Sequence, residues 1–360
     1  MLHAMIMAGG GGTRFWPRSR AKKPKQFLQL GGEKSLIQQA YERLEATVPP
    51  ERMWVITAEA YRQETKTHLP LLPDGHVIGE PVGRDTAPCV ALGAALIHKS
   101  DPDAIMLVSP ADHVIEPVQE FRRAVHSAHE ICKDNPETFL TFGIPPTYPA
   151  VGYGYIQKGP EATQRQGLTA FRVGAFKEKP SLELAQQFFS SGQYFWNSGI
   201  FVWHAKTVLN SLKEHKPALY QAAMRIANAW ETPERMNVLQ SEYAGMEKIS
   251  VDYAIMEKAR DLMVLQTPYK WDDVGSWMAL ERLHPQDSDG NTVLANHVGI
   301  KTGNSIVVSD NQKKLITTIG VNNLLIVQDG DALLVADKND EAGVKHLVET
   351  LRKRGMENFL

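Results

Sequence analysis

Through roughly its first 280 residues, the chain alternates short apolar runs with helical stretches. A helix is predicted between the first two runs, because Ser35 and Gln38 form a capping-box start and are followed by an apolar stripe on one helical face. Strands that alternate with helices indicate βαβ units, and therefore an α/β fold with a mixed, mostly parallel sheet. The predicted strands lie at residues 3–8, 53–57, 76–80, 104–109, 138–144, 199–203 and 262–266.

The pattern changes near Asp287, where the sequence DSDGN predicts a linker. Short β-type runs then recur at about ten-residue spacing, with Gly, Asn or Asp between them. We therefore expect two domains: a catalytic domain at 1–285, and a β-rich, β-helix-like module at 286–360 that ends in a helix. The final helix is predicted from the apolar stripe Val344, Leu347, Val348 and Leu351.

The composition excludes some classes of protein. The 360 residues carry a formal net charge of −2, which gives no indication of a nucleic-acid partner. No apolar run approaches the roughly 20 residues of a membrane helix, so we expect no membrane partner. Cys89 and Cys132 are the two cysteines, and two unpaired thiols are typical of a cytoplasmic protein.

A glycine-rich loop follows the first predicted strand. The sequence GGGGTR covers Gly9 to Arg14, and further cations follow before Glu33, the first carboxylate in the chain. Neither GxxxxGK[ST] nor GxGxxG fits this loop, which excludes a P-loop and a dinucleotide fingerprint, and with the latter an NAD-type dehydrogenase. The backbone N–H groups of these glycines, together with Arg14 and Lys25, could bind phosphate groups. A simple turn beside a solvent-exposed basic face would also explain the pattern.

Carboxylates near other strand ends could hold the metal ion that phosphoryl transfer requires. Asp112 follows the buried run at 104–109, and Asp272 and Asp273 lie in the loop of KWDDVGSW. Mg²⁺ prefers carboxylate oxygens together with substrate phosphates, so two such aspartates are candidate ligands. Each aspartate taken alone is equally typical of a loop or a helix N-cap.

Four further stretches offer groups for a base and a sugar. Glu80 or Asp85 in GEPVGRDTAP could accept hydrogen bonds from guanine N1–H and N2–H, which adenine lacks. AVGYGYI, FKEKP and WNSG combine glycine with Glu178, Lys179 and Asn197, which suit sugar hydroxyls and a sugar phosphate. A surface turn, or a turn capped by Asn197, is the alternative interpretation.

Taken in order, these motifs closely resemble the mannose-1-phosphate guanylyltransferases, within the sugar-1-phosphate nucleotidyltransferases. The resemblance covers about residues 2 to 285 and rests on GGGGTRFWPRSRAKKPKQF, GEPVGRDTAP, SPADHVI, GYGYI, FKEKP, WNSGIF, SVDYAIMEK and WDDVGSW. It implies a Rossmann-like nucleotidyltransferase fold. It also implies a Mg²⁺-dependent reaction of GTP with mannose 1-phosphate that gives GDP-mannose and pyrophosphate.

The resemblance also implies roles for individual residues. Arg14, Lys25, Asp112, Lys179 and Asp273 would be catalytic, and Asp112 and Asp273 would hold the metal. The nucleotide would bind at Ala8, Gly9, Gly10, Gly12, Thr13, Arg14, Lys25, Glu80, Gly83 and Asp85. The sugar phosphate would bind at Tyr153, Gly154, Glu178, Lys179, Asn197 and Asp252.

The sequence departs from these relatives in two respects. Many relatives carry a further isomerase domain, and because this chain ends at Leu360 we expect no isomerase activity. Arg18 stands where many relatives have Leu. The alternatives are a nucleotidyltransferase for another hexose 1-phosphate or another NTP, and a non-catalytic regulatory relative that binds nucleotide sugars. The C-terminal module is compatible with a homodimer or with covering the active site.

Overall fold

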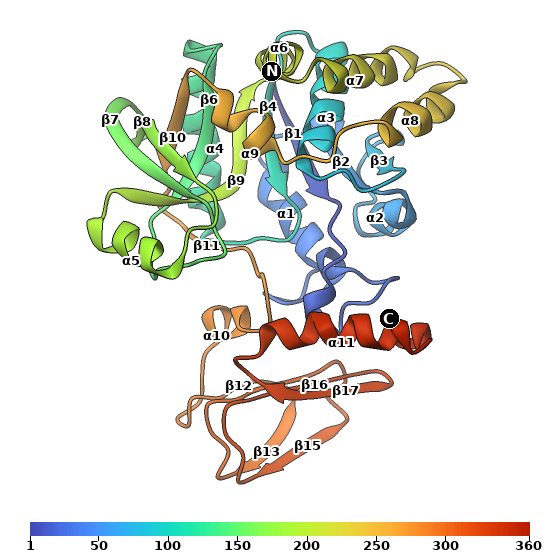
Figure 1. Cartoon of the computed structure of the whole chain (residues 1–360), viewed down its shortest axis with the longest axis vertical. Helices are drawn as coiled ribbons and strands as arrows, with labels where there is room; N and C mark the ends of the chain where they lie inside the picture. The colour runs from blue at the N-terminus through green and yellow to red at the C-terminus, as the bar shows by residue number, and fades with distance from the viewer. The chain divides into compact units, whose positions relative to one another are not determined.

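The computed structural model describes residues 1–360, apart from the side chains of residues 341 and 342. Its chain forms two compact units, each assembled from several segments (Figure 1). Unit 1 contains Met1–Gly9, Ala40–Ala111 and Ile115–Trp271, and unit 2 contains Gly10–Gln39, Asp112–Val114 and Asp272–Leu360. A domain boundary near residue 285 remains a proposal from the sequence.

Unit 1 is built on a mixed sheet, which confirms the α/β prediction. In the described residues its strand order is β3-β2-β1-β4-β9-β6-β10-β8-β7. The block β3-β2-β1-β4 is parallel, and β6 and β10 are also parallel to each other. The strands are β1 (Leu2–Ala8), β2 (Met53–Ala58), β3 (Val77–Glu80), β4 (Ile105–Pro110), β6 (Phe139–Ile144), β7 (Tyr155–Arg165), β8 (Leu168–Lys177), β9 (Tyr194–His204) and β10 (Leu262–Gln266).

Helices cover the sheet because each carries an apolar face. Figure 1 shows α3, α6 and α7 grouped beside β1 and β4, and their side chains form one large core cluster with these strands. The helix α4 packs through Phe121 on Phe142 of β6. The helices are α1 (Leu36–Glu45), α2 (Arg62–His68), α3 (Thr86–Ser100), α4 (Val118–Asp134), α5 (Leu182–Ser191), α6 (Ala205–His215), α7 (Pro217–Ala229), α8 (Arg235–Ala244) and α9 (Val251–Ala254).

The expected capping box at the start of α1 is present. The Ser35 backbone N–H donates to Gln38 Oε1 at 3.0 Å, so the side chain of Gln38 satisfies a donor at the helix entry. The hairpin of β7 and β8 is absent from the sequence-based strands. Its residues are half-exposed and its register shifts three times, so neither strict alternation nor a continuous apolar run marks it.

Unit 2 holds the C-terminal β-module. β12, β14 and β16 stack in parallel in one sheet and β13 and β15 in another, while β17 closes the first sheet antiparallel to β16. Successive strands of a solenoid stack in this way, which confirms the β-helix-like module. Its strands are β12 (Thr292–Leu294), β13 (Asn296–Ile300), β14 (Ile306–Ser309), β15 (Leu315–Ile319), β16 (Leu324–Asp329) and β17 (Ala332–Asp337).

The last helix joins this module to the segment after the glycine loop. Val344 and Val348 of α11 (Glu341–Lys353) pack in one core with Phe15 and Trp16. The indole N–H of Trp16 also donates to the carbonyl of Phe359 at 2.7 Å. The expected apolar stripe is therefore the packing face of α11. After the KWDDVGSW loop comes the short helix α10 (Ala279–Leu283). The short strands β5 (Val114–Glu116) and β11 (Lys270–Asp272) pair with each other.

A glycine inside the sheet tests this packing. A Cβ on Gly143 of β6 would lie 2.5 Å from Val264 Cγ2 and 2.9 Å from Phe195 Cβ. Overpacking of this kind costs typically about 1–3 kcal/mol, so we expect Gly143→Ala to lower the free energy of unfolding by that amount in urea melts. Gly174→Ala in β8 is the control, because its Cβ would meet neighbours at an ordinary 3.6 Å. Equal stability of the two variants would contradict the described packing.

Candidate active site

The glycine loop is shaped to pack tightly on Lys25. It leaves β1 after Ala8, and Gly12 caps the short helical turn Thr13–Phe15 with φ +57°. A Cβ on Gly12 would lie 2.2 Å from Lys25 Cβ. Glycine is therefore required at Gly12 both by the left-handed backbone and by the contact.

Lys25 brings two distant aspartates together within unit 2. Its ammonium Nζ lies 2.6 Å from Asp112 Oδ2 and 2.6 Å from the backbone oxygen of Asp273. The Lys25 residue is only 8% exposed, so its charge is largely removed from water. Such a cation is tolerated when it is paired and hydrogen-bonded, which both aspartates provide.

The local charges keep Asp112 ionised. Burial would raise its pKa, but the positive charges of Lys25 and His113 and the hydrogen bond from Lys25 together lower it below the ordinary value. An ionised carboxylate is the form that ligates a metal.

The tandem aspartates have different tasks. Asp272 Oδ1 accepts from the guanidinium of Arg282 at 3.0 Å and from the Val274 N–H at 2.8 Å. Asp273 Oδ1 accepts from the Gly275 N–H at 3.1 Å, and its carbonyl accepts from Lys25. Asp272 therefore holds the loop in shape, while Asp273 is the residue placed with Lys25 and Asp112.

The residues present fit a magnesium ion that arrives with its substrate. Among the described residues, no group of three or more His, Cys, Asp or Glu side chains is arranged to hold a metal. Mg²⁺ commonly binds through one or two carboxylates, several waters and substrate phosphates, so it does not require such a group. Asp112 and Asp273 match this sparse ligand set.

The basic run after the glycine loop is partly structural. The guanidinium of Arg20 donates to Asp331 Oδ1, and Arg18 Nε lies 3.5 Å from Asp329 Oδ2. Both acids belong to the end of β16 and the turn that follows it, so these arginines tie the run to the β-module. Arg14 is exposed, and no ion pair of its guanidinium is found in the described part of the chain. Arg14 is thus available to an anionic ligand.

The expected sugar residues come together in unit 1. Asn197 Nδ2 donates to Asp252 Oδ1 at 2.9 Å, and the Asn197 N–H donates to the carbonyl of Gly154 at 2.8 Å. A Cβ on Gly154 would lie 2.6 Å from Glu178 Oε2. Lys179 Nζ is 3.1 Å from Glu178 Oε1 and remains mostly exposed. Segments more than 90 residues apart thus form one polar cluster.

Aromatic side chains and charge complete this cluster. The ring centroid of Tyr153 lies 5.1 Å from Trp196 and 5.1 Å from Trp271. Burial raises the pKa of Asp252 to about 6, helped by the negative charge of Glu178. Tyr153 and Trp196 directly precede Gly154 and Asn197 in the chain, so aromatic rings flank the residues of the polar cluster.

In the segment expected to bind the base, the two candidate acids Glu80 and Asp85 have different surroundings. Asp85 has φ +67° and caps α3, because its Oδ1 accepts from the Thr86 N–H at 2.8 Å. Glu80 is 7% exposed and lies beside the glycine loop, since a Cβ on Gly9 would be 2.9 Å from Glu80 Oε2. Of the two acids, Glu80 is therefore the one beside the glycine loop. Gly83 is exposed between the two acids, with no atom within 4 Å of its Cβ position.

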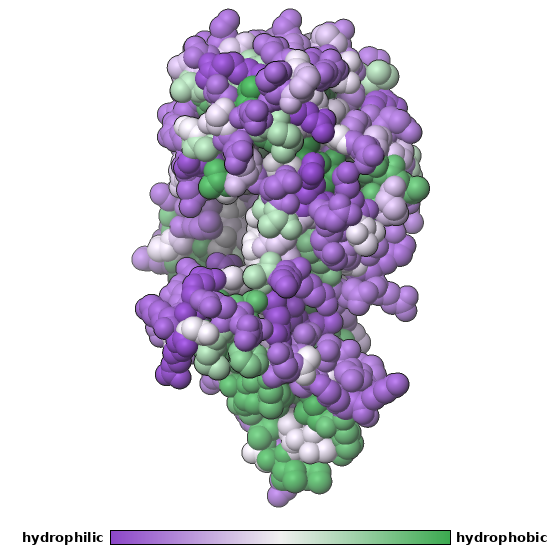
Figure 2. Space-filling model, turned by 90° about the vertical axis from the view of Figure 1, so that its right-hand side faces the viewer, coloured by the Kyte–Doolittle hydropathy of each residue, from purple (hydrophilic) through white to green (hydrophobic). Residues whose placement is uncertain are grey.

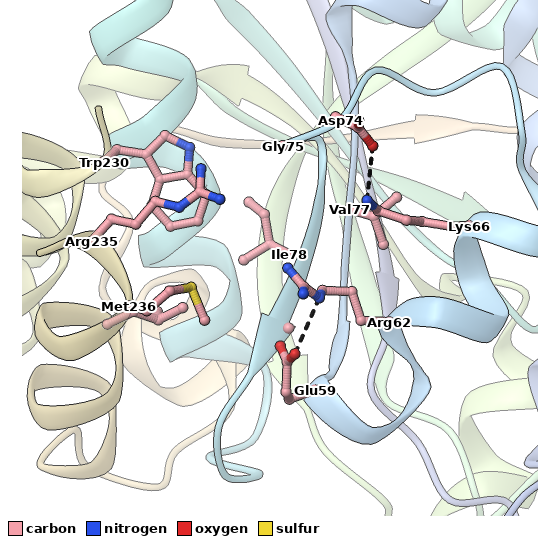
Figure 3. Close-up of a pocket in the computed structure, with 12 residues that line it drawn as sticks. Glu59, Arg62, Lys66, Asp74, Gly75, Val77, Ile78, Trp230, Arg235 and Met236 are labelled. Atoms are coloured by element: carbon pink, nitrogen blue, oxygen red, sulfur yellow. Dashed lines mark hydrogen bonds and ion pairs between the residues drawn. The ribbon is translucent and has the colours of Figure 1, made fainter. Parts of the chain in front are cut away.

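A cavity of about 310 Å³ at the edge strand β3 contains none of the expected site residues. Figure 3 shows Glu59 paired with Arg62, and Lys66 paired with Asp74, on one side of Ile78. Because carboxylates already neutralise these two cations, we assign this cavity no role in phosphate binding.

The sequence analysis missed Tyr243 as a site residue. Its hydroxyl donates to Glu80 Oε1 from α8, more than 160 residues later in the chain. A buried tyrosine needs a polar partner, but a sequence does not name one, so no local signal could have found this pair.

Known proteins resemble this chain along nearly its whole length. The mannose-1-phosphate guanylyltransferase of Escherichia coli strain K12 is 39% identical over 98% of this chain and 74% of its own. A crystal structure titled mannose-1-phosphate geranyltransferase, from Thermus thermophilus, matches with a TM-score of 0.87 and 34% identity, over 98% of this chain and 99% of that one. A Helicobacter pylori structure titled mannose-6-phosphate isomerase matches with a TM-score of 0.60 and 25% identity, over 75% of this chain and 99% of that one.

Two family descriptions match as well. The nucleotidyl transferase family matches residues 3–290, and the "MannoseP isomerase/GMP-like beta-helix domain" matches residues 295–351. The motifs that suggested the resemblance lie in the first of these ranges. The chain belongs to the nucleotidyl transferase family, and within it to the mannose-1-phosphate guanylyltransferases.

Proposed function

We propose that this protein transfers GMP from GTP to α-D-mannose 1-phosphate, giving GDP-mannose and pyrophosphate. The type of reaction is supported by the family to which the chain belongs. The observation that supports this site is the ammonium of Lys25, a residue packed against Gly12, which binds Asp112 and the backbone of Asp273. A cation, two carboxylates and the backbone N–H groups of the glycine loop are the groups that bind a metal-bound triphosphate.

The chemistry is an in-line displacement. A phosphate oxygen of mannose 1-phosphate forms a bond to the α-phosphorus of GTP, and the bond from that phosphorus to the pyrophosphate oxygen breaks. The nucleophile is already anionic, so no general base is required. Positioning and charge neutralisation therefore supply most of the rate.

The chain's residues divide these tasks. Mg²⁺, when bound at Asp112 and Asp273, would neutralise phosphate charge. Arg14 and Lys25 would stabilise the charge that develops on the pyrophosphate leaving group. Lys179 would hold the phosphate of the sugar, while Glu178, Asn197 and the backbone of Gly154 would bind its hydroxyls.

Two alternatives are tested by the same assay. Another hexose 1-phosphate or another NTP would use the same machinery, and a panel of both with Mg²⁺ identifies the preferred pair by pyrophosphate release. A regulatory relative would bind nucleotide sugar without releasing pyrophosphate.

Cellular location and assembly are part of the proposal. We place the protein in the cytoplasm on the strength of its two buried free thiols, Cys89 and Cys132. Among the described residues, no helix has the length and apolarity needed to cross a membrane.

A homodimer is proposed through the β-module. β13 and β15 turn His297 and Thr318 inward, where they hydrogen-bond at 2.8 Å, and turn apolar side chains outward. Soluble sheets show the reverse pattern. Figure 2 shows hydrophobic residues gathered over these strands; those of β13 and β15 are Val298, Ile300, Leu315 and Ile319. A second copy would cover this face with an identical one.

The metal assignment predicts the behaviour of Asp112→Asn. The amide keeps an acceptor for Lys25 but loses the charge that binds Mg²⁺, so we expect turnover to fall by at least about a hundredfold. The melting temperature should fall as well, because the buried Lys25 loses its counter-charge, and the rate is therefore measured well below it. Turnover is measured as the rate of pyrophosphate release at saturating GTP and mannose 1-phosphate. Asp74→Asn, which changes an exposed aspartate paired with Lys66, is the control. A near-normal rate for Asp112→Asn would exclude Asp112 as a ligand.

The loop geometry predicts the behaviour of Gly12→Ala. Its Cβ would push on Lys25, and a displacement of about 1 Å at a catalytic group can cost about a hundredfold in rate. Gly192→Ala matches the backbone strain, with φ +63°, but its Cβ would meet no atom within 4 Å. We expect both variants to lose some stability and Gly12→Ala alone to lose turnover. Equal rates would show that the contact with Lys25 is unimportant.

The dimer is tested by Ile319→Lys. Ile319 is 72% exposed within the proposed interface, and a buried unpaired charge there would oppose association. Light scattering after size exclusion should report a dimer for the wild type and a monomer for this variant. Leu71→Lys, at a similarly exposed leucine of unit 1, should remain dimeric. A monomeric wild type would refute the interface.

A further inference from the structure

The segment that contains Glu80 is tied to the end of α8 at two points. The hydroxyl of Tyr243 donates to Glu80 Oε1, and the guanidinium of Arg84 donates to the carbonyl of Ala244. The neighbouring Glu242 is itself held by the guanidinium of Arg225 at 2.8 and 2.7 Å. The end of α8 is therefore fixed, and with it the direction of the tyrosine hydroxyl.

Tyr243 and the glycine loop approach different oxygens of Glu80. Tyr243 is fully buried in the core that joins α3, α7 and α8 to the sheet. It engages Oε1, while Oε2 lies toward Gly9 at the start of the glycine loop. Both oxygens are thus oriented, and neither is free to rotate without breaking the bond to Tyr243.

The protonation state of Glu80 decides which purine it matches. A carboxylate only accepts hydrogen bonds, so it suits the N1–H and N2–H donors of guanine. A neutral carboxyl donates one hydrogen bond and accepts another, which suits the N1 acceptor and N6–H donor of adenine. A site built for one pattern rejects the other because buried polar groups are left unpaired.

We propose that Tyr243 is a specificity-determining positioning residue, whose hydroxyl keeps Glu80 an oriented carboxylate and so makes the site select a guanine over an adenine nucleotide. This inference rests on the proposed function, because it requires Glu80 to face the base of a nucleoside triphosphate.

The surroundings make this hydrogen bond consequential. Burial raises the pKa of Glu80 to about 7, and the hydrogen bond from Tyr243 acts in the opposite direction. The other titratable groups that face the pair are Cys89 of α3, whose pKa is also raised by burial, and Arg84, whose positive charge acts on Tyr243. Without the hydroxyl, the pKa of Glu80 would rise further, and less of the carboxylate form would be present at neutral pH.

The test compares Tyr243→Phe with wild type in the full chain. kcat/KM is measured for GTP and for ATP with saturating mannose 1-phosphate and Mg²⁺, from about pH 6 to about pH 9. We expect the acid limb for GTP to move to higher pH, and kcat/KM for GTP near neutral pH to fall severalfold, because less of Glu80 is then ionised. The preference for GTP over ATP should narrow there and return at high pH, with an unchanged KM for mannose 1-phosphate.

Three controls separate the possible failures. Tyr220→Phe on α7 is a matched variant and should behave as wild type in both pH profiles. Glu80→Gln carries a permanent donor and acceptor, so it should prefer ATP at every pH and lose the acid limb. Melting temperatures confirm that each variant is folded.

The outcomes are distinct. No pyrophosphate from wild type and GTP would refute the proposed function. An unchanged GTP preference in Glu80→Gln would refute the assignment of the base to Glu80, and the inference with it. A changed preference in Glu80→Gln with a wild-type pH profile in Tyr243→Phe would overturn the role of Tyr243 alone.

Discussion

The ion pair between Lys25 and Asp112 is the interaction on which the proposed centre depends. A buried ammonium is costly unless its donors are satisfied, and Lys25 satisfies two of them with Asp112 and the backbone of Asp273. The same contacts hold the two aspartates near each other, and the packing of Lys25 requires glycine at position 12. One lysine thus connects the loop, the carboxylates and the proposed phosphate chemistry.

Much of this could be predicted from the sequence. The strands β1 and β4 are nearly continuous apolar runs, so the residues that follow their carboxyl ends, such as Gly9 and Asp112, were identifiable as candidates. The solenoid strands and the stripe on α11 were predictable for the same reason. The spacing of apolar residues in the sequence indicates which side chains are buried, and the burial of these side chains stabilises these strands and this helix.

The remainder depends on partners that periodicity does not encode. The structural roles of Arg18 and Arg20 follow from Asp329 and Asp331, which lie some 310 residues later. Tyr243 reaches Glu80 only because α8 folds back over β3. Asp272 and Asp273 look alike in the sequence, and only the pairing of Asp272 with Arg282 distinguishes them. Long-range pairing of polar groups is therefore the part that the structure adds.

The most direct test of a metal centre at Asp112 and Asp273 is the binding of Mn²⁺ to the protein–GTP complex. Mn²⁺ is used as a paramagnetic replacement for Mg²⁺. Electron paramagnetic resonance titration should show tight Mn²⁺ binding for the wild type and binding weakened by about ten- to a hundredfold in Asp273→Asn, as expected for the loss of a charged ligand. Asp272→Asn should retain more of the affinity than Asp273→Asn. Equal Mn²⁺ affinity in the wild type and Asp273→Asn would contradict a metal centre at Asp112 and Asp273.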